Sequence, residues 1–461
     1  MHRNMRLCAA MRAVLLAGLL GAPGAGLAHA SEGGIILLLP TDLYVAGGVA
    51  SVIATVLLIL AIPERAARRM FRPVALGRAP GIGRFSLLTS ILSAGLLLWA
   101  VIEGFHGAQD PKHNPLPLLV WTGMWVFLFA AQGVFGDVWR WLNPFRGSYG
   151  VLRLLGLPRL LRWPGWLGHW PAVLVWVGFS ALLMIDIAPA DPDRLAGIVL
   201  GYWGLTLAAC VTFGPIWLRR GEGISVALGL YAQLTPLRRA GGAVRLSAPG
   251  WSLLRGPVPG WSLALLMLIM LGTGSFDGLN ETFRWLAAIG VNPLAFEGRS
   301  QVITQNTLGL ALCVAALVAV YGLAVRAGLW LVGEQRFGLA FRMLAPAILP
   351  IAFGYHLAHY LPVALVEGQY LADMVSHLLG GPGYHVTTGF LFSPDKVRMI
   401  FLSEAGFVVL GHILAILMSH AAALQLTGSH RRAAISQAPL ALFMIFYTFF
   451  GLWLLASPRG A

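Results

Sequence analysis

Charged residues are scarce in this sequence. They make up 11% of its 461 residues, whereas 58% are hydrophobic, and the mean hydropathy is +0.76. Soluble globular domains contain about a quarter charged residues, so this composition excludes them. The sequence therefore predicts a polytopic membrane protein whose surroundings are a lipid bilayer.

Acidic residues are scarcer still, because 18 Asp and Glu stand against 32 Lys and Arg and leave a net charge of +14. Such a charge is also found in proteins that bind nucleic acids. Here the basic residues are nearly all Arg and lie in short blocks between apolar segments, which is typical of the cytoplasmic loops of membrane proteins. We therefore expect no nucleic-acid partner.

Cysteines and compact catalytic motifs are also lacking. Cys8 lies near the N-terminus, and Cys210 and Cys313 lie inside apolar segments, so no disulfide framework is readable. The sequence has no Walker loop, HExxH, paired CxxC, GxSxG elbow or dinucleotide-binding glycine fingerprint. Any chemistry must therefore come from residues that are dispersed along the chain.

The N-terminal thirty residues have the pattern of a secretory signal. A basic region at 2–12 precedes an apolar core at 13–20, and Ala28-His29-Ala30 is a small-x-small cleavage site. We expect residues 1–30 to be a cleaved signal peptide, which would place Ser31 outside the cytoplasm. An uncleaved anchor is the alternative, although the apolar core is short for a membrane span.

Ten apolar segments follow, and most reach the roughly 20 residues that a helix needs to cross the hydrocarbon core. Together they predict an all-α transmembrane helical bundle, formed as one domain by residues 31–461. The expected spans are 41–62, 85–105, 115–137, 168–188, 194–218, 260–278, 303–333, 342–366, 399–422 and 437–456.

The distribution of charge predicts how the bundle is oriented. If the chain starts outside, five of its connections are cytoplasmic, and these hold 22 of the 32 Lys and Arg residues. We therefore expect a multi-pass membrane protein with both termini on the outer side. The outer loops would be 106–114, which contains His106 and His113, and 367–398. The cytoplasmic connections would be 63–84, 138–167, 219–259, 326–342 and 423–436.

Histidines lie inside the eighth and ninth apolar segments. His356 and His359 are three residues apart, so an α-helix sets them about 60° apart around its axis and roughly 4.5 Å apart along it, facing one neighbour. Ionisable side chains within a membrane usually face a bundle interior or a cavity. His412 and His420 are roughly 12 Å apart along a regular helix, too far for one mononuclear site, and we favour His412.

A carboxylate completes this candidate site. Asp277 follows Gly272-Thr273-Gly274 near the end of the sixth apolar segment, where it can act as a ligand or a general base. Imidazole and carboxylate groups suit Zn²⁺, Fe²⁺ or Mn²⁺, which lower the pKa of a bound water. The alternative is that each His bonds across helices and each acid is solvated. We predict a divalent metal ion with ligands among Asp277, His356, His359, His412 and His420, and catalytic roles for Asp277, His359 and His412.

Several strings, taken together, resemble one known family. They are DPKHNPLPLLVW at 110–121, the segment 275–300, YHLAHYLPVALVEGQ at 355–369, GHILAILMSH at 411–420 and the segment 436–455. Their combination resembles the bacterial membrane-bound fenitrothion hydrolases, an organophosphorus hydrolase family that includes a form built from two different subunits. The resemblance implies hydrolysis of the P–O aryl bond of a phosphotriester, and a homologous second membrane subunit as a partner.

The expected substrate is an apolar small molecule, which would partition into the bilayer. An outer-leaflet cavity lined by Trp121, Trp125 and Phe276 would collect it, although ordinary packing is the alternative for these aromatic residues. The competing class of function is a permease, or a metal-handling or assembly protein. The prolines of the eighth apolar segment agree with a permease, because transporters often contain broken helices.

Overall fold

The structure is a computed structural model that describes residues 39–79 and 83–459, and the predicted signal peptide lies outside these residues. Ten helical spans are long and apolar enough to cross a membrane, which confirms the predicted all-α polytopic bundle. They are α3 (Thr41–Ala61), α5 (Gly83–His106), α6–η1–α7 (Pro115–Pro117, Leu118–Leu128, Phe129–Phe135), η2–α10 (Gly165–Leu167, Trp170–Met184), α11 (Pro192–Phe213), α15 (Trp261–Leu279), α17 (Ile303–Leu331), α18–η6–α19 (Phe337–Leu344, Ala345–Ile348, Leu349–His359), α21 (Pro394–Thr427) and α22 (His430–Ala456).

Shorter elements fill the connections. The helices are α4 (Glu64–Met70), α8 (Trp139–Leu142), α9 (Pro144–Leu154), α12 (Ile216–Arg220), α13 (Gly223–Tyr231), η3 (Ala232–Leu234), α14 (Trp251–Arg255), α16 (Phe283–Ala288), η4 (Pro293–Ala295), η5 (Arg299–Gln301), α20 (Leu361–Leu378) and η7 (Gly389–Phe392). Three strands, β1 (Val74–Arg78), β2 (Leu237–Ala240) and β3 (Ala243–Leu246), form an antiparallel sheet in the order β1-β3-β2.

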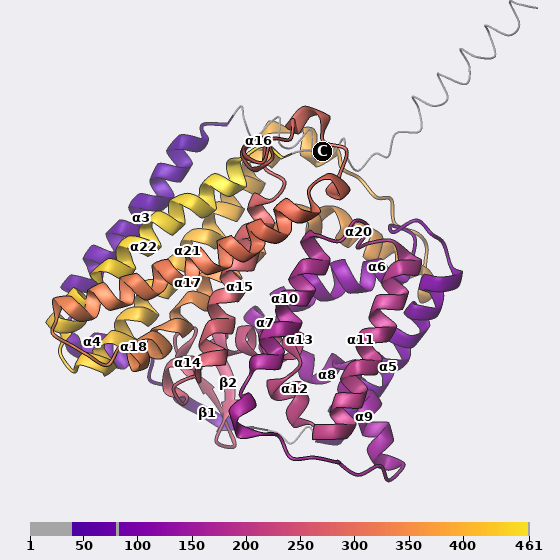
Figure 1. The fold of residues 1–461 in the computed structure, drawn as a ribbon, viewed down its shortest axis with the longest axis horizontal. Helices are drawn as coiled ribbons and strands as arrows, with labels where there is room; N and C mark the ends of the chain where they lie inside the picture. Colours follow the sequence, from indigo (N-terminus) through magenta and orange to yellow (C-terminus); the bar gives the residue numbers. More distant parts are fainter. Residues whose placement is uncertain (1–38, 80–82, 460–461) are drawn as a thin grey trace, which may run out of the picture.

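The connections gather at two ends of the bundle, because successive spans run in opposite directions (Figure 1). We call the end that carries the β-sheet the sheet end. There the sheet joins residues 74–78 to 237–246, and Arg336 donates a hydrogen bond to the carbonyl of Leu426. We call the other end the site end. There Arg299 donates to the carbonyl of Leu183, and the backbone N–H of Phe283 donates to the carbonyl of Pro458.

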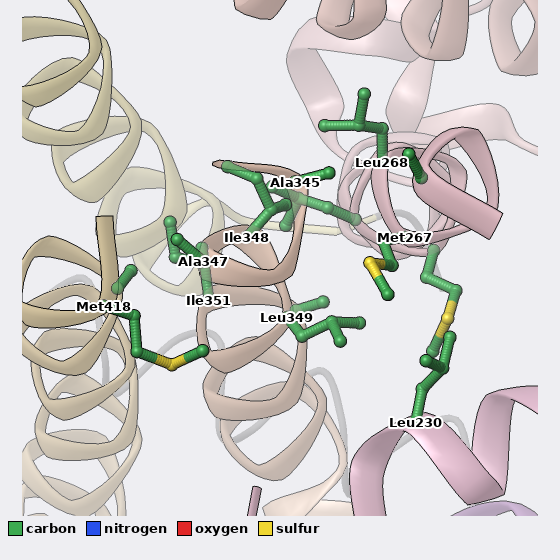
Figure 2. Packing of buried hydrophobic residues seen from close by; sticks show 14 of the residues in the cluster. Leu230, Met267, Leu268, Ala345, Ala347, Ile348, Leu349, Ile351 and Met418 are labelled. Carbon is green, nitrogen blue, oxygen red and sulfur yellow. The ribbon is translucent and has the colours of Figure 1, made fainter. Parts of the chain in front are cut away.

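Two spans form the centre of the bundle. The α15 and α18–η6–α19 spans are buried over two-thirds of their apolar length, whereas α3 is mostly exposed and suited to contact lipid. In Figure 1, α3, α17, α21 and α22 lie on one side of α15, and α5, α10 and α11 lie on the other. Figure 2 shows α15, η6, α19, α13 and α21 meeting through Met267, Ile348, Leu349, Leu230 and Met418.

The eighth span ends earlier than the sequence predicts. The expected helix runs to residue 366, but α19 ends at His359 and a separate helix, α20, begins at Leu361. Pro362 explains the break, because proline lacks an N–H donor and its ring excludes the carbonyl of the preceding turn. Tyr360 joins the two helices, so His359 and Tyr360 lie together at the site end.

The connection predicted at 219–259 also contains more structure than expected. Every residue of α13 is buried except Gly229, and the helix packs against α7 and α10 inside the bundle. Glu222 caps it by accepting hydrogen bonds from the backbone N–H groups of Ile224 and Ser225. The helix brings Tyr231 to the centre of the bundle.

Candidate functional site

An aspartate and a histidine meet near the site end. Asp277, in the last turn of α15, places its Oδ2 atom 3.3 Å from Nε2 of His359, the last residue of α19. The two side chains are only 15% and 7% exposed. Tyr360 donates a hydrogen bond from its hydroxyl to the same Oδ2 atom. The structure therefore brings together two of the predicted site residues and adds a tyrosine that the sequence did not single out.

Close packing of α15 against α19 makes this meeting possible. A Cβ atom at Gly278 would lie 1.7 Å from the hydroxyl oxygen of Tyr355, so only glycine fits there. The break at Tyr360 then turns the chain away immediately after His359. Asp277 precedes Gly278 directly. The close packing of Tyr355 against Gly278 therefore also determines how α15 and α19 align, and with it where the Asp277 carboxylate meets the His359 imidazole.

The C-terminal segment covers the histidine. Arg459 pairs with Thr282 in an isolated β-bridge, and its Nη2 atom donates a hydrogen bond of 3.0 Å to Nδ1 of His359. A guanidinium has only donors, so Nδ1 must accept. A neutral imidazole then carries its proton on Nε2 and donates it to Asp277. This tautomer is assigned from the hydrogen-bond network.

A small cavity of about 30 Å³ lies beside the pair. This volume holds one or two water molecules, since a water needs at least roughly 10–15 Å³. Its walls come from η1, α10, α13, α15 and α19. They include the predicted residues Asp277, His356, His359 and Trp125, together with Trp176, Ser180, Leu183, Met184, Tyr231, Met270, Thr273, Gly274, Ala352, Tyr355 and Tyr360.

Three buried polar atoms on these walls have no hydrogen-bond partner within the described part of the chain. They are Nε1 of Trp125, the hydroxyl oxygen of Tyr355 and Nε2 of His356. The His356 ring packs against two aromatic rings. Its centroid lies 4.9 Å from the ring centroid of Trp125 and 4.9 Å from that of Tyr360. Leaving a buried donor or acceptor unsatisfied costs about 1–3 kcal/mol. The arrangement therefore favours ordered water in the cavity.

A second, much larger cavity of about 1030 Å³ lies between α5, η1, α10 and α11. Its lining is almost entirely apolar and includes Trp121. The paired side chains of Asp186 and Arg194, 2.6 Å apart, lie at the site end of it. The hydrogen bond from Arg194 holds the pKa of the Asp186 carboxyl below its ordinary value.

Aromatic rings separate the two cavities. Phe179 lines the large cavity and Trp125 lines the small one, and their ring centroids are 5.0 Å apart. Phe276, the third aromatic residue expected to line a cavity, is fully buried against Trp285 and lines neither. The predicted group of Trp121, Trp125 and Phe276 is thus divided among three environments.

The two histidines of α21 lie away from this site. His412 is buried and donates from Nδ1 to the carbonyl of Val408 at 2.8 Å. His420 lies toward the sheet end, where Gln437 donates to its Nδ1 at 3.0 Å and His430 approaches its Nε2 at 3.2 Å. Neither lines the small cavity. Among residues 39–79 and 83–459, no group of three His, Cys, Asp or Glu side chains is arranged to hold a metal ion.

The outer-loop residues form a separate, exposed group. Nδ1 of His113 lies 2.6 Å from Asp110, and the pKa of the Asp110 carboxyl is lowered by a hydrogen bond from the backbone N–H of Lys112 and by His113. The His113 ring also contacts Tyr370 of α20, so the two predicted outer loops meet. His106 is the last residue of α5.

Comparison with known proteins adds no relative, because no family model, curated protein or solved structure matches the chain.

Proposed function

We propose that the chain is a membrane-bound hydrolase of apolar organophosphate triesters that reach it from the bilayer. The observation that carries the proposal is the buried Asp277–His359 pair, which lines a water-sized cavity that aromatic rings separate from a large apolar cavity. A positioned carboxylate within hydrogen-bond reach of a water molecule can act as a general base, and the contact with His359 fixes the orientation of Asp277.

Asp277 is the base in the proposed reaction. Both ring nitrogens of His359 already have partners, Arg459 at Nδ1 and Asp277 at Nε2, so the imidazole serves to position the carboxylate. Tyr360 and His359 both meet Oδ2, which leaves Oδ1 as the oxygen for a water in the cavity. The carboxylate takes a proton from this water as the water oxygen bonds to phosphorus.

The leaving group then departs with its electron pair. The P–O aryl bond breaks, the aryl oxide leaves, and the second product is the phosphodiester acid. A nitrophenolate-type group needs little help from an acid because its negative charge is delocalised over the ring. Arg459, which hydrogen-bonds to His359, supplies a positive charge at the site that opposes the developing negative charge. No step is routed through the predicted divalent metal ion, because the described residues contain no group of three His, Cys, Asp or Glu side chains arranged to hold one, and His412 and His420 do not line the small cavity.

The large cavity supplies the substrate in this proposal. A volume of about 1030 Å³ exceeds what a small triester needs, and its lining is apolar. The phosphorus atom would face Trp125, and rotation of the Trp125 and Phe179 rings would join the two cavities. The small cavity by itself admits water only.

The proposal places the chain in the bacterial inner membrane with the site end facing the periplasm. The concentration of Arg in the sheet-end connections supports this orientation. A homologous second membrane subunit, implied by the family resemblance, would be an additional partner.

A permease is the second candidate, and one observation favours it. The eighth span is interrupted by the 3-10 turn η6 between α18 and α19, and interrupted helices often surround transport sites. A transporter would move an apolar solute between the two faces of reconstituted vesicles without releasing a phenol.

The proposal is tested by phenol release from an aryl phosphotriester with the purified chain, alone and with any co-purifying homologue. We expect hydrolysis by the wild type and a loss of at least about 100-fold in kcat for Asp277→Asn. His412→Ala and His420→Ala serve as controls, because both are buried residues that do not line the small cavity, and they should retain activity. A wild type inactive in both preparations would overturn the proposal.

A further inference from the structure

Five arginines surround a cavity at the sheet end. The cavity has a volume of about 660 Å³ and lies between the sheet, the start of η3 and α14. Its described lining contains no Asp or Glu side chain. The carboxylate of Asp137 acts on Arg238 through space. The lining arginines are Arg72, Arg238, Arg239, Arg245 and Arg255.

The sheet itself holds two of these arginines in opposition. Arg238 on β2 pairs directly with Arg245 on β3 in the antiparallel register. Like charges directly opposite one another destabilise a pair of strands. Arg238 donates to the hydroxyl of Ser252, but Nε of Arg245 is buried and has no hydrogen-bond partner among residues 39–79 and 83–459. An anion in the cavity would remove both penalties.

Three exposed aliphatic side chains lie together on the opposite face of the sheet, which also carries Arg239. Leu246 pairs with Val74 on one side and with Leu237 on the other, so these three side chains share one face. They are 43%, 64% and 49% exposed. A row of exposed aliphatic side chains next to a basic cavity suits the boundary between hydrocarbon and headgroups.

We propose that this arginine cavity binds the phosphate headgroup of an anionic phospholipid from the leaflet at the sheet end. Guanidinium groups bind phosphate oxygens with two parallel hydrogen bonds, and basic pockets beside transmembrane helices bind anionic headgroups. The exposed row of Val74, Leu237 and Leu246 favours a lipid over a soluble phosphate, because these side chains need hydrocarbon as a neighbour. This site is independent of the proposed hydrolase activity at the other end of the bundle.

The test is native mass spectrometry of the delipidated full chain, titrated with phosphatidylglycerol or phosphatidylcholine. We expect one tightly bound phosphatidylglycerol, and binding about tenfold or more weaker in Arg245→Gln and in Arg238→Gln/Arg245→Gln. Arg65→Gln/Arg69→Gln removes the same charge from exposed positions of α4 at the same end, and should bind like the wild type. Equal binding by the control and by the cavity variants would overturn the proposal.

Thermal unfolding supplies a second readout, because the effect of Arg245→Gln on Tm should differ between the lipid-free and the lipid-bound protein. Without lipid, Arg245→Gln should raise Tm by about 1 °C, because it removes one of two opposed charges. With phosphatidylglycerol, the wild type should gain more in Tm than the variant. Inorganic phosphate or glycerol phosphate forms the third arm. If either one raises the wild-type Tm in an arginine-dependent way and the lipid does not, the lipid assignment is wrong.

Discussion

Arg459 donates a hydrogen bond of 3.0 Å to Nδ1 of His359 and thereby determines which nitrogen of the imidazole carries the proton. The proton is left on Nε2, the atom that faces Asp277. A residue from the segment after the last span therefore orients the central pair of the candidate site, although 100 residues separate it from His359.

Arg459→Ala should lower kcat about tenfold with little change in KM, because His359 becomes free to take the other tautomer. Arg459→Lys restores a donor and a positive charge and should recover part of the activity. Steady-state kinetics on an aryl phosphotriester measures both. A KM effect alone would instead assign Arg459 to substrate binding, and the positioning role would be wrong.

Removal of divalent metal ions should leave the proposed reaction intact, because Asp277 acts on water directly. The measurement is hydrolysis after prolonged treatment with a chelator, together with the metal content of the purified chain. If activity disappears on chelation and returns with stoichiometric metal, the hypothesis of a metal site is supported and the proposed metal-free general-base mechanism is wrong.

If the proposed hydrolysis holds, Phe179→Ala should change its preference for substrate size. The Phe179 ring stands between the large cavity and Trp125, so its removal widens the connection between the two spaces. The ratio of kcat/KM for a bulky triester to that for a small one should rise several-fold. Leu174→Ala, at an exposed position on the same helix, is the control and should leave the ratio unchanged.

Gly328→Ala should destabilise the bundle by about 1–3 kcal/mol. A Cβ atom at Gly328 would lie 1.7 Å from the backbone carbonyl oxygen of Ser436, where α17 and α22 cross. Gly322, on the same helix, would meet only Phe341 at an ordinary 3.7 Å, so Gly322→Ala should be neutral or stabilising by about 0.5–1 kcal/mol. Thermal unfolding in detergent compares them, and equal Tm values would contradict the crossing geometry.

The spans were predictable because length and hydropathy alone decide which segments cross a membrane. The shared environment of His356, His359 and Asp277 agrees with the expectation that intramembrane ionisable groups face a cavity. Pro362 is a local signal that marks the end of α19, although the sequence prediction continued the span past it.

The remaining site residues depend on long-range packing. His412 and His420 belong to α21, and no local pattern specifies how that helix is rotated against α19. Arg459 gives no local signal beyond being the one basic residue after the last apolar segment. Strands of four or five residues are equally hard to predict, because their partners are set by contacts distant in sequence.

The β-sheet also fixes an order of events during synthesis. Its middle strand, β3, is made roughly 165 residues after β1, with four membrane spans between them. At about 5–20 residues per second, β1 leaves the ribosome roughly 10 to 30 s before its partner exists. Until then its backbone groups are hydrated or paired elsewhere. The sheet can close only after α5, the third and fourth spans and α11 have been translated, so its closure marks the completion of this half of the bundle.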